Sequence, residues 1–194
     1  MTEAEIFAEF RAAEALLEGH FILSSGMHSP RYLQCARVLM DPGRASRLAE
    51  ALAALIPDQL RMTIDIVVSP AMGGVIIGHE MGRALGVEAL FVERPQGVFE
   101  LRRGFRLATG QRVLLVEDVV TTGLSSREAM KAISQAGGEV VAAAALVDRS
   151  NGAADLGVPF FPLLRLDVPS FEADALPPEL AALTAEKPGS RKAA

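Results

Sequence analysis

The sequence is poor in residues that make covalent or metal cross-links. Cys35 is the single cysteine among 194 residues, so no disulfide can form within the chain. The three histidines, His20, His28 and His79, are scattered without the spacing of zinc ligands. These absences exclude a disulfide-stapled scaffold and a cysteine-rich zinc module.

Positive charge and long apolar runs are also scarce. The chain has 24 acidic and 19 basic residues and a net charge of −5, which argues against nucleic-acid or anionic-membrane partners but leaves a local anion site open. Only three basic residues are lysines, so cationic chemistry before Lys131 must come from arginine. No apolar run is long enough to span a membrane, and the acidic N-terminus lacks a signal-type apolar region. We therefore expect a cytoplasmic protein.

Half of the residues are hydrophobic, which suffices for the core of one domain. Helical spacing over residues 3–18 predicts a first helix ending at Gly19. Residues 20–39 mix short apolar pairs with Ser, Gly and Pro, which predicts a strand, a turn and a second strand. A helix capped by Asp41 should follow, with Pro42 in its first turn. Its expected buried stripe consists of Leu48, Leu52 and Leu55.

From residue 64 onward, predicted strands alternate with predicted helices. The strands are expected at 64–68, 89–93, 113–116, 140–147 and 160–166, with helices over 75–86 and about 125–136. This order predicts an α/β fold with a mostly parallel central sheet and helices on both faces. Such sheets bind ligands beyond the carboxyl ends of their strands. Three polar turns occupy that edge: 69–74, 117–124 and 148–152.

The most informative stretch is V-L-L-V-E-D-V-V-T-T-G-L-S-S-R-E-A, residues 113–129. An apolar strand leads into Glu117 and Asp118, and a turn of small hydroxylated residues leads into a helix. Free N–H groups and the dipole at a helix N-terminus favour a phosphate, and paired carboxylates suit the vicinal hydroxyls of a sugar. An alternative interpretation stays open, because residues 125–128 also spell an S-x-x-E capping box led by Ser125.

The block of strand, acidic pair, V-V-T-T-G turn and helix resembles the phosphoribosyl pyrophosphate signature of type I phosphoribosyltransferases. The segment F-I-L-S-S-G-M-H-S-P-R-Y-L-Q at 21–34 is similar to one found in the orotate phosphoribosyltransferase family. The resemblance extends to S-P-A-M-G-G at 69–74 (a pyrophosphate loop), the catalytic loop at 93–105, and L-V-D-R-S-N-G at 146–152. It implies the type I fold in one domain over 1–185, with a small hood from about residues 1–40, a mobile hairpin loop and a loose tail over 186–194.

The resemblance also implies a reaction and its residues. Phosphoribosyl pyrophosphate and orotate, with Mg²⁺ held mainly through substrate oxygens, would give orotidine 5′-monophosphate and pyrophosphate, a step of pyrimidine synthesis. The implied catalytic residues are Glu117, Asp118, Arg102 and Arg103. The implied phosphoribosyl pyrophosphate site comprises Arg94, Ala71, Met72, Gly73, Glu117, Asp118, Val119, Val120, Thr121, Thr122, Gly123, Leu124 and Ser125. The implied orotate site comprises Thr121, Arg149, Tyr32 and Leu33.

Two departures from the family pattern keep other functions open. The loop at 69–74 lacks the expected lysine, and residues 93–105 hold arginines but neither lysine nor histidine. The alternatives are a type I phosphoribosyltransferase acting on a purine or uracil, and a non-catalytic regulator that binds phosphoribosyl pyrophosphate. Arg149 could also simply pair with Asp148. The resemblance further implies a homodimer in which loop 93–105 reaches the neighbouring active site.

Overall fold

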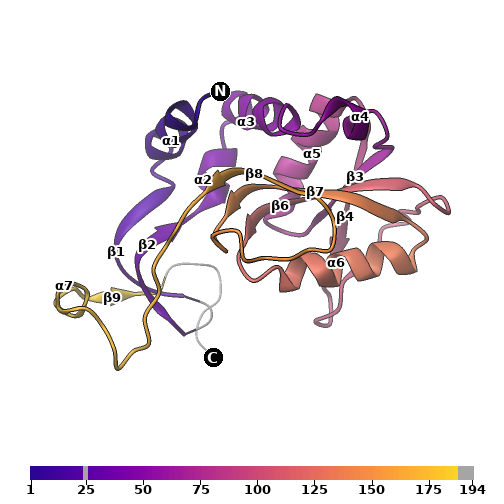
Figure 1. Ribbon diagram of the computed structural model, residues 1–194. Helices are drawn as coiled ribbons and strands as arrows, with labels where there is room; N and C mark the ends of the chain where they lie inside the picture. The colour runs from indigo at the N-terminus through magenta and orange to yellow at the C-terminus, as the bar shows by residue number, and fades with distance from the viewer. Residues whose placement is uncertain (24–25, 188–194) are drawn as a thin grey trace.

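A six-stranded sheet forms the centre of the structure, a computed structural model that describes residues 1–23 and 26–187 (Figure 1). Its strand order is β5-β4-β3-β6-β7-β8. The bounds are β3 Ile66–Pro70, β4 Glu88–Glu93, β5 Glu100–Leu101, β6 Arg112–Val120, β7 Glu139–Asp148 and β8 Phe160–Arg165. Only β5 runs antiparallel to its neighbour. The predicted α/β fold with a mostly parallel sheet is thus confirmed.

Helices cover both faces of this sheet, as Figure 1 shows. Helices α3 (Pro42–Ala53) and α5 (Gly74–Leu85) pack on one face, and α6 (Leu124–Gln135) packs on the other. Burial on both faces explains the continuous apolar runs of the central strands, since every residue of β3 is buried. Asp41 caps α3 and Gly86 ends α5 in the left-handed conformation, as the sequence predicts.

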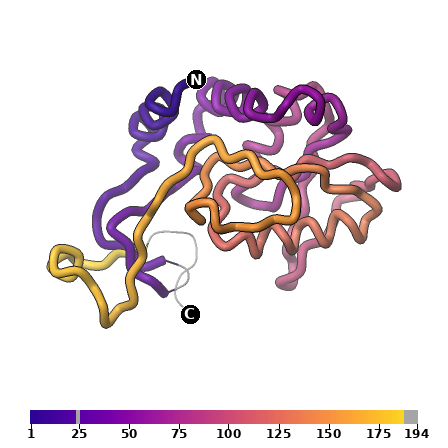
Figure 2. Tube along the Cα trace, viewed as in Figure 1, coloured from indigo at the N-terminus to yellow at the C-terminus, as the bar shows by residue number. Residues whose placement is uncertain are grey.

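The hood is a second, three-stranded sheet in the order β2-β1-β9. Its elements are β1 (Leu16–Ile22), β2 (His28–Leu33) and β9 (Ala185–Glu186). The remaining helices are α1 (Glu3–Ala12), α2 (Cys35–Leu39), α4 (Asp58–Arg61) and α7 (Pro178–Ala181). Figure 2 shows the chain after β8 crossing from the large sheet to the hood. The last residues of the chain that are described therefore complete the hood.

Contacts along this C-terminal segment hold the hood in place. His28 and Phe171 exchange two backbone hydrogen bonds of 2.8 Å, and the Ser29 hydroxyl donates to the carbonyl of Pro169 at 3.0 Å. Glu186, at the start of the expected loose tail, pairs with Phe21 within the hood sheet. Residues 188–194 of that tail lie outside the described residues, as do residues 24–25 of the hood motif.

Three details of the sequence prediction for the N-terminal third are wrong. Residues 35–39, which fall in the segment predicted as strand, turn and strand, form the helix α2 instead. The first helix ends at Ala12, because Glu14 adopts a left-handed φ of 48° and Leu16 and Leu17 then pair with β2 as strand residues. Strand pairing outweighs the helical spacing of these apolar side chains. Leu55 is 46% exposed, because α3 ends at Ala53 and the chain turns before the buried stripe extends to this residue.

Candidate active site

Strand β6 carries both acidic residues of the predicted site. The strand continues to Val120 instead of ending at Val116, so Glu117 and Asp118 lie within the strand and not in the loop after it. Successive strand residues point to opposite faces of a sheet. The two carboxylates therefore meet different surroundings, Glu117 toward the helix α6 and Asp118 toward the loop before α5.

The Glu117 side chain is buried beneath the start of α6. It is 6% exposed, and its Oε1 accepts a hydrogen bond from the Ser126 hydroxyl at 3.2 Å. Burial, together with the neighbouring Asp118 charge, raises the pKa of Glu117 to about 8, although the Ser126 hydrogen bond and Arg94 act in the opposite direction. The carboxyl group is thus poised to gain or lose a proton close to neutral pH.

Asp118 packs tightly against the loop that precedes α5. Its Oδ1 accepts from the backbone N–H of Val119 at 2.9 Å. A Cβ at Gly73 would lie only 2.4 Å from Oδ2, so any larger residue here would displace the Asp118 carboxylate. Burial raises the pKa of Asp118. The structure thus brings Gly73, and with it the predicted loop that also contains Ala71 and Met72, against Asp118.

The turn after β6 presents small polar residues to the solvent. Thr121, Thr122 and Ser125 are exposed, and the N–H of Leu124 donates to the Thr122 hydroxyl at 3.3 Å. Gly123, with a φ of +73°, occupies the N-cap of α6 and makes no side-chain cap. The capping-box interpretation is therefore wrong, because Ser125 lies inside the helix. The Thr122 hydroxyl accepts from the first N–H group of α6, while the N-cap Gly123 itself supplies no side-chain acceptor.

Arg149 lies next to this turn, because β6 and β7 run parallel in register. Val120 pairs with Asp148, and the backbone N–H of Arg149 donates to the Val120 carbonyl at 2.8 Å. Within the described residues, the buried Nε of Arg149 has no hydrogen-bond partner. Burial lowers the pKa of its guanidinium. This partly exposed side chain thus carries a buried nitrogen that lacks a hydrogen-bond partner.

The alternative pairing of Arg149 with Asp148 does not occur. The Asp148 carboxylate accepts hydrogen bonds from the backbone N–H and hydroxyl of Ser150 and lies 3.7 Å from Arg165. Asp148 is fully buried and serves to shape the turn after β7. Its neighbour Arg149 is left available to a ligand.

The hood approaches the same edge through β2 and α2. Tyr32 is half-buried and Leu33 is buried, and the thiol of Cys35 lies 3.9 Å from the Asp118 carbonyl. Tyr32 and Cys35 both act electrostatically on Arg149, which places the three side chains near one another. The predicted orotate residues therefore gather between the hood and the carboxyl ends of β6 and β7.

The hairpin over 93–105 forms as predicted, with Val92 and Glu93 paired to Leu101 and Glu100. Its arginines are engaged within the protein. Arg103 donates to Glu93 at 2.7 Å, and Arg102 lies 3.8 Å from the same carboxylate.

Arg94, at the base of the hairpin, pairs with Glu128 of α6 and stacks on Phe99, with 4.0 Å from Cζ to the ring centroid. In this conformation, each of the three predicted loop arginines forms an ion pair with an acidic side chain of the protein.

Sequence reasoning missed the residues that hold the predicted ones. Ser126, Glu93 and Glu128 each contact a predicted site residue. Ser126 left a detectable signal, since a serine stands on the otherwise apolar buried face of α6. Glu93 and Glu128 left none, because their partners are remote in sequence or depend on the hairpin conformation.

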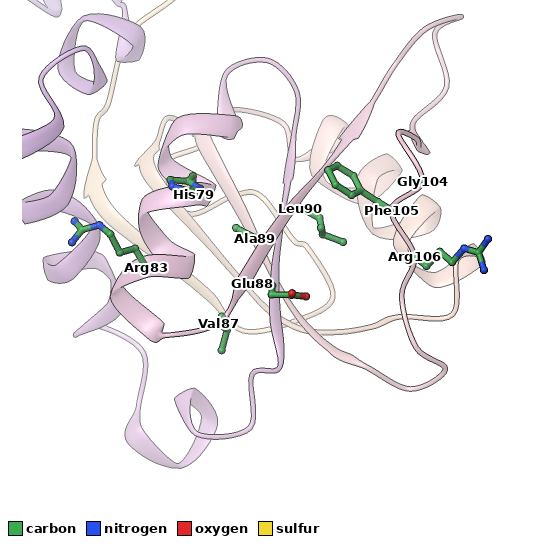
Figure 3. Close-up of a pocket in the computed structure, with 9 residues that line it drawn as sticks. All are labelled: His79, Arg83, Val87, Glu88, Ala89, Leu90, Gly104, Phe105 and Arg106. Carbon is green, nitrogen blue, oxygen red and sulfur yellow. The ribbon is translucent and has the colours of Figure 1, made fainter.

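One further cavity, of about 590 Å³, lies at the amino-terminal half of β4 (Figure 3). It is lined by α5, β4 and residues 104–106, and none of the predicted site residues lines it. Within the described part of the chain, no cluster of three His, Cys, Asp or Glu side chains could hold a metal ion. None of the described helices combines the length and apolar character needed to span a membrane.

Comparison with known proteins identifies the family. A model of the phosphoribosyl transferase domain matches residues 38–157. Orotate phosphoribosyltransferase of Rhizorhabdus wittichii is 75% identical over 193 residues, covering 100% of this chain and 98% of the relative. The enzyme of that name from Novosphingobium aromaticivorans is 76% identical over 191 residues, or 98% of each chain. The chain belongs to the orotate phosphoribosyltransferase family.

A solved structure of this family has the same fold. The Aeropyrum pernix orotate phosphoribosyltransferase has a TM-score of 0.70 and 28% identity, and the match covers 81% of this chain and 91% of that one.

The Mycobacterium tuberculosis orotate phosphoribosyltransferase, solved in complex with phosphoribosyl pyrophosphate, has a TM-score of 0.64 and 28% identity, with 84% and 96% covered. The type I fold expected from the sequence is therefore confirmed.

Proposed function

We propose that this protein transfers the 5-phosphoribosyl group of phosphoribosyl pyrophosphate to orotate in pyrimidine nucleotide synthesis. A bond forms between a ring nitrogen of orotate and C1 of the ribose, this nitrogen gives up its proton to water, and the bond from C1 to the pyrophosphate oxygen breaks. The products are orotidine 5′-monophosphate and pyrophosphate. The observation that carries this proposal is the buried Nε of Arg149, which has no hydrogen-bond partner among the described residues and lies beside the turn that follows the acidic pair of β6.

The acidic pair and the turn after it bind the phosphoribosyl group. Glu117 and Asp118 accept hydrogen bonds from the ribose hydroxyls, and their negative charge stabilises the positive charge that develops on the sugar ring as pyrophosphate leaves. The 5′-phosphate lies against the backbone N–H groups of residues 121–125 at the start of α6. The exposure of Thr121, Thr122 and Ser125 supports this placement.

Arg149 recognises the carboxylate of orotate. A planar guanidinium and a carboxylate form two parallel hydrogen bonds, and the burial of Arg149 strengthens this attraction. Tyr32, Leu33 and Thr121 contact the pyrimidine ring. Adenine, hypoxanthine and uracil carry no carboxylate and would leave the buried cation unpaired, which disfavours the purine and uracil alternatives.

The leaving pyrophosphate is bound by Ala71, Met72 and Gly73 through backbone groups, and by the hairpin arginines. The hairpin arginines turn to the pyrophosphate when their ion pairs break. These pairs join Arg94 to Glu128, and Arg102 and Arg103 to Glu93. Arginine stays protonated near neutral pH, so these residues stabilise charge and donate no proton. The presence of both acids and of these cations favours an enzyme over a regulator that only binds phosphoribosyl pyrophosphate.

Mg²⁺ is the expected cofactor. The carboxylates of Glu117 and Asp118 are hard oxygen donors that fit this ion, but two acids without a third protein ligand fit an ion held mainly by substrate oxygens. When bound, the ion would neutralise charge on the pyrophosphate, while Glu117 and Asp118 orient the ribose. We further propose a homodimer in which loop 93–105 serves the neighbouring site. Both substrates belong to soluble metabolism, so we place the reaction in the cytoplasm.

The test is an assay of purified protein with phosphoribosyl pyrophosphate, Mg²⁺ and one base at a time. We expect orotate absorbance to fall and pyrophosphate to accumulate in equal amount, with no turnover of adenine, hypoxanthine or uracil. Turnover of another base without orotate would establish the first alternative. Binding of phosphoribosyl pyrophosphate without turnover of any base would establish the regulator.

A further inference from the structure

Helix α6 carries one polar residue on its buried face. The buried residues of this helix are Ser126, Ala129, Ala132 and Ile133, and their spacing places them on the side that packs against the sheet. Ser126 is only 1% exposed. A buried hydroxyl is unfavourable unless it forms a hydrogen bond, so an alanine would otherwise suit this position better.

The hydroxyl of Ser126 has its partner on the opposite strand. It donates to Oε1 of Glu117 at 3.2 Å and so joins α6 to the acidic pair of β6. Among the described residues, no group donates to the other oxygen, Oε2. One oxygen of the carboxylate is therefore fixed by the protein, and the other is free to accept a hydrogen bond from a ligand.

The charged groups around Glu117 come from three elements. Asp118 follows it on β6 and repels its negative charge, whereas Arg94 approaches from the base of the hairpin and attracts it. Glu128 of α6 forms an ion pair with Arg94, which weakens the attraction between Arg94 and the Glu117 carboxylate. The Ser126 hydroxyl is the donor that favours the ionised carboxylate independently of the hairpin.

We propose that Ser126 is a positioning residue for phosphoribosyl transfer, which fixes Oε1 of Glu117 so that Oε2 can accept a ribose hydroxyl. This role rests on the proposed function of Glu117. Ser126 touches no substrate, so its contribution must concern the sugar substrate more than the base.

The test compares Ser126→Ala with the wild-type protein and with Ser134→Ala. Ser134 lies on the exposed side of the same helix and serves as the matched control. Loss of this hydrogen bond to a charged group should leave the Glu117 carboxylate free to turn, so KM for phosphoribosyl pyrophosphate should rise about tenfold.

KM for orotate should change little, and Ser134→Ala should behave as the wild type. A thermal melt of each variant verifies that it is folded. An equal rise in both KM values, or no rise in either, would overturn the proposal.

A binding measurement separates this inference from the proposed function. Calorimetric titration with Mg²⁺ and phosphoribosyl pyrophosphate should show that Ser126→Ala weakens binding in the wild-type background and not in the Glu117→Ala background. An additive effect would show that Ser126 does not act through Glu117. Failure of the wild-type protein to convert orotate would instead refute the proposed function.

Discussion

Alanine in place of Gly73 is the sharpest test of the acidic pair. The new Cβ would lie 2.4 Å from Oδ2, 2.6 Å from Cγ and 2.7 Å from Oδ1 of Asp118. Non-bonded heavy atoms prefer separations of about 3.5 Å, so the carboxylate has to move by about 1 Å. Gly73 has a φ of −58°, which alanine adopts readily, so the substitution adds no backbone strain. The perturbation is therefore confined to the position of one carboxylate.

The size of the effect follows from this displacement. A catalytic group misplaced by about 1 Å reduces activity by about 100-fold. Overpacking of a tightly packed position costs about 1–3 kcal/mol of the free energy of unfolding. We therefore expect kcat/KM for phosphoribosyl pyrophosphate to fall about 100-fold in Gly73→Ala, while the protein stays folded at room temperature.

Steady-state kinetics and denaturant unfolding measure these two quantities. Gly43→Ala on α3 is the control, because its Cβ would meet only the ends of the Asp41 and Arg47 side chains, at 3.3 and 3.5 Å. The stability loss of Gly73→Ala should vanish in an Asp118→Ala background, where nothing obstructs the methyl group. Wild-type kcat/KM in Gly73→Ala would refute the assignment of Asp118 to the reaction.

Three further outcomes are expected. Asp118→Asn should lower kcat by about 100-fold or more with an unchanged circular dichroism spectrum, and retained turnover would contradict its electrostatic role. Arg149→Lys should raise KM for orotate, by the equivalent of about 1.5–3 kcal/mol, far more than KM for phosphoribosyl pyrophosphate; equal rises would show that Arg149 does not bind the base. Glu117 binds a proton more tightly when folded, since its pKa is raised from 4.5 to about 8. Its contribution therefore makes the free energy of unfolding fall as pH rises through this interval, and urea titrations of Glu117→Gln should show a flatter dependence.

The sequence predicted the central part of the site well, because local order determines it. Apolar runs specify buried parallel strands, and the carboxyl ends of neighbouring parallel strands meet at one edge. These two rules place Arg149 of β7 beside Thr121 after β6, as the pairing of Val120 with Asp148 requires. The helix after the turn was also predicted to within one residue at each end.

The remaining details depend on contacts between distant segments. The close approach of Gly73 to Asp118 joins positions 45 residues apart and leaves no mark in either motif. The first helix failed for the same reason, because the pairing of Leu16 with Leu33 decides the structure there. The ion pairs of the hairpin arginines could not be predicted from the sequence either, since Glu93 looks there like an ordinary strand residue.

The site is electrostatically unsatisfied in a way that matches its proposed substrates. Burial raises the pKa of Glu117 and Asp118 and lowers the pKa of Arg149, so at all three the protein disfavours the charged form. Hydroxyl donors of the ribose and the carboxylate of orotate are the groups that would restore these interactions. Substrate binding should therefore favour ionised acids and a paired arginine together. The chain folds with these unfavourable groups already in place, so they lower its free energy of unfolding. Binding of phosphoribosyl pyrophosphate and Mg²⁺ should therefore raise the Tm.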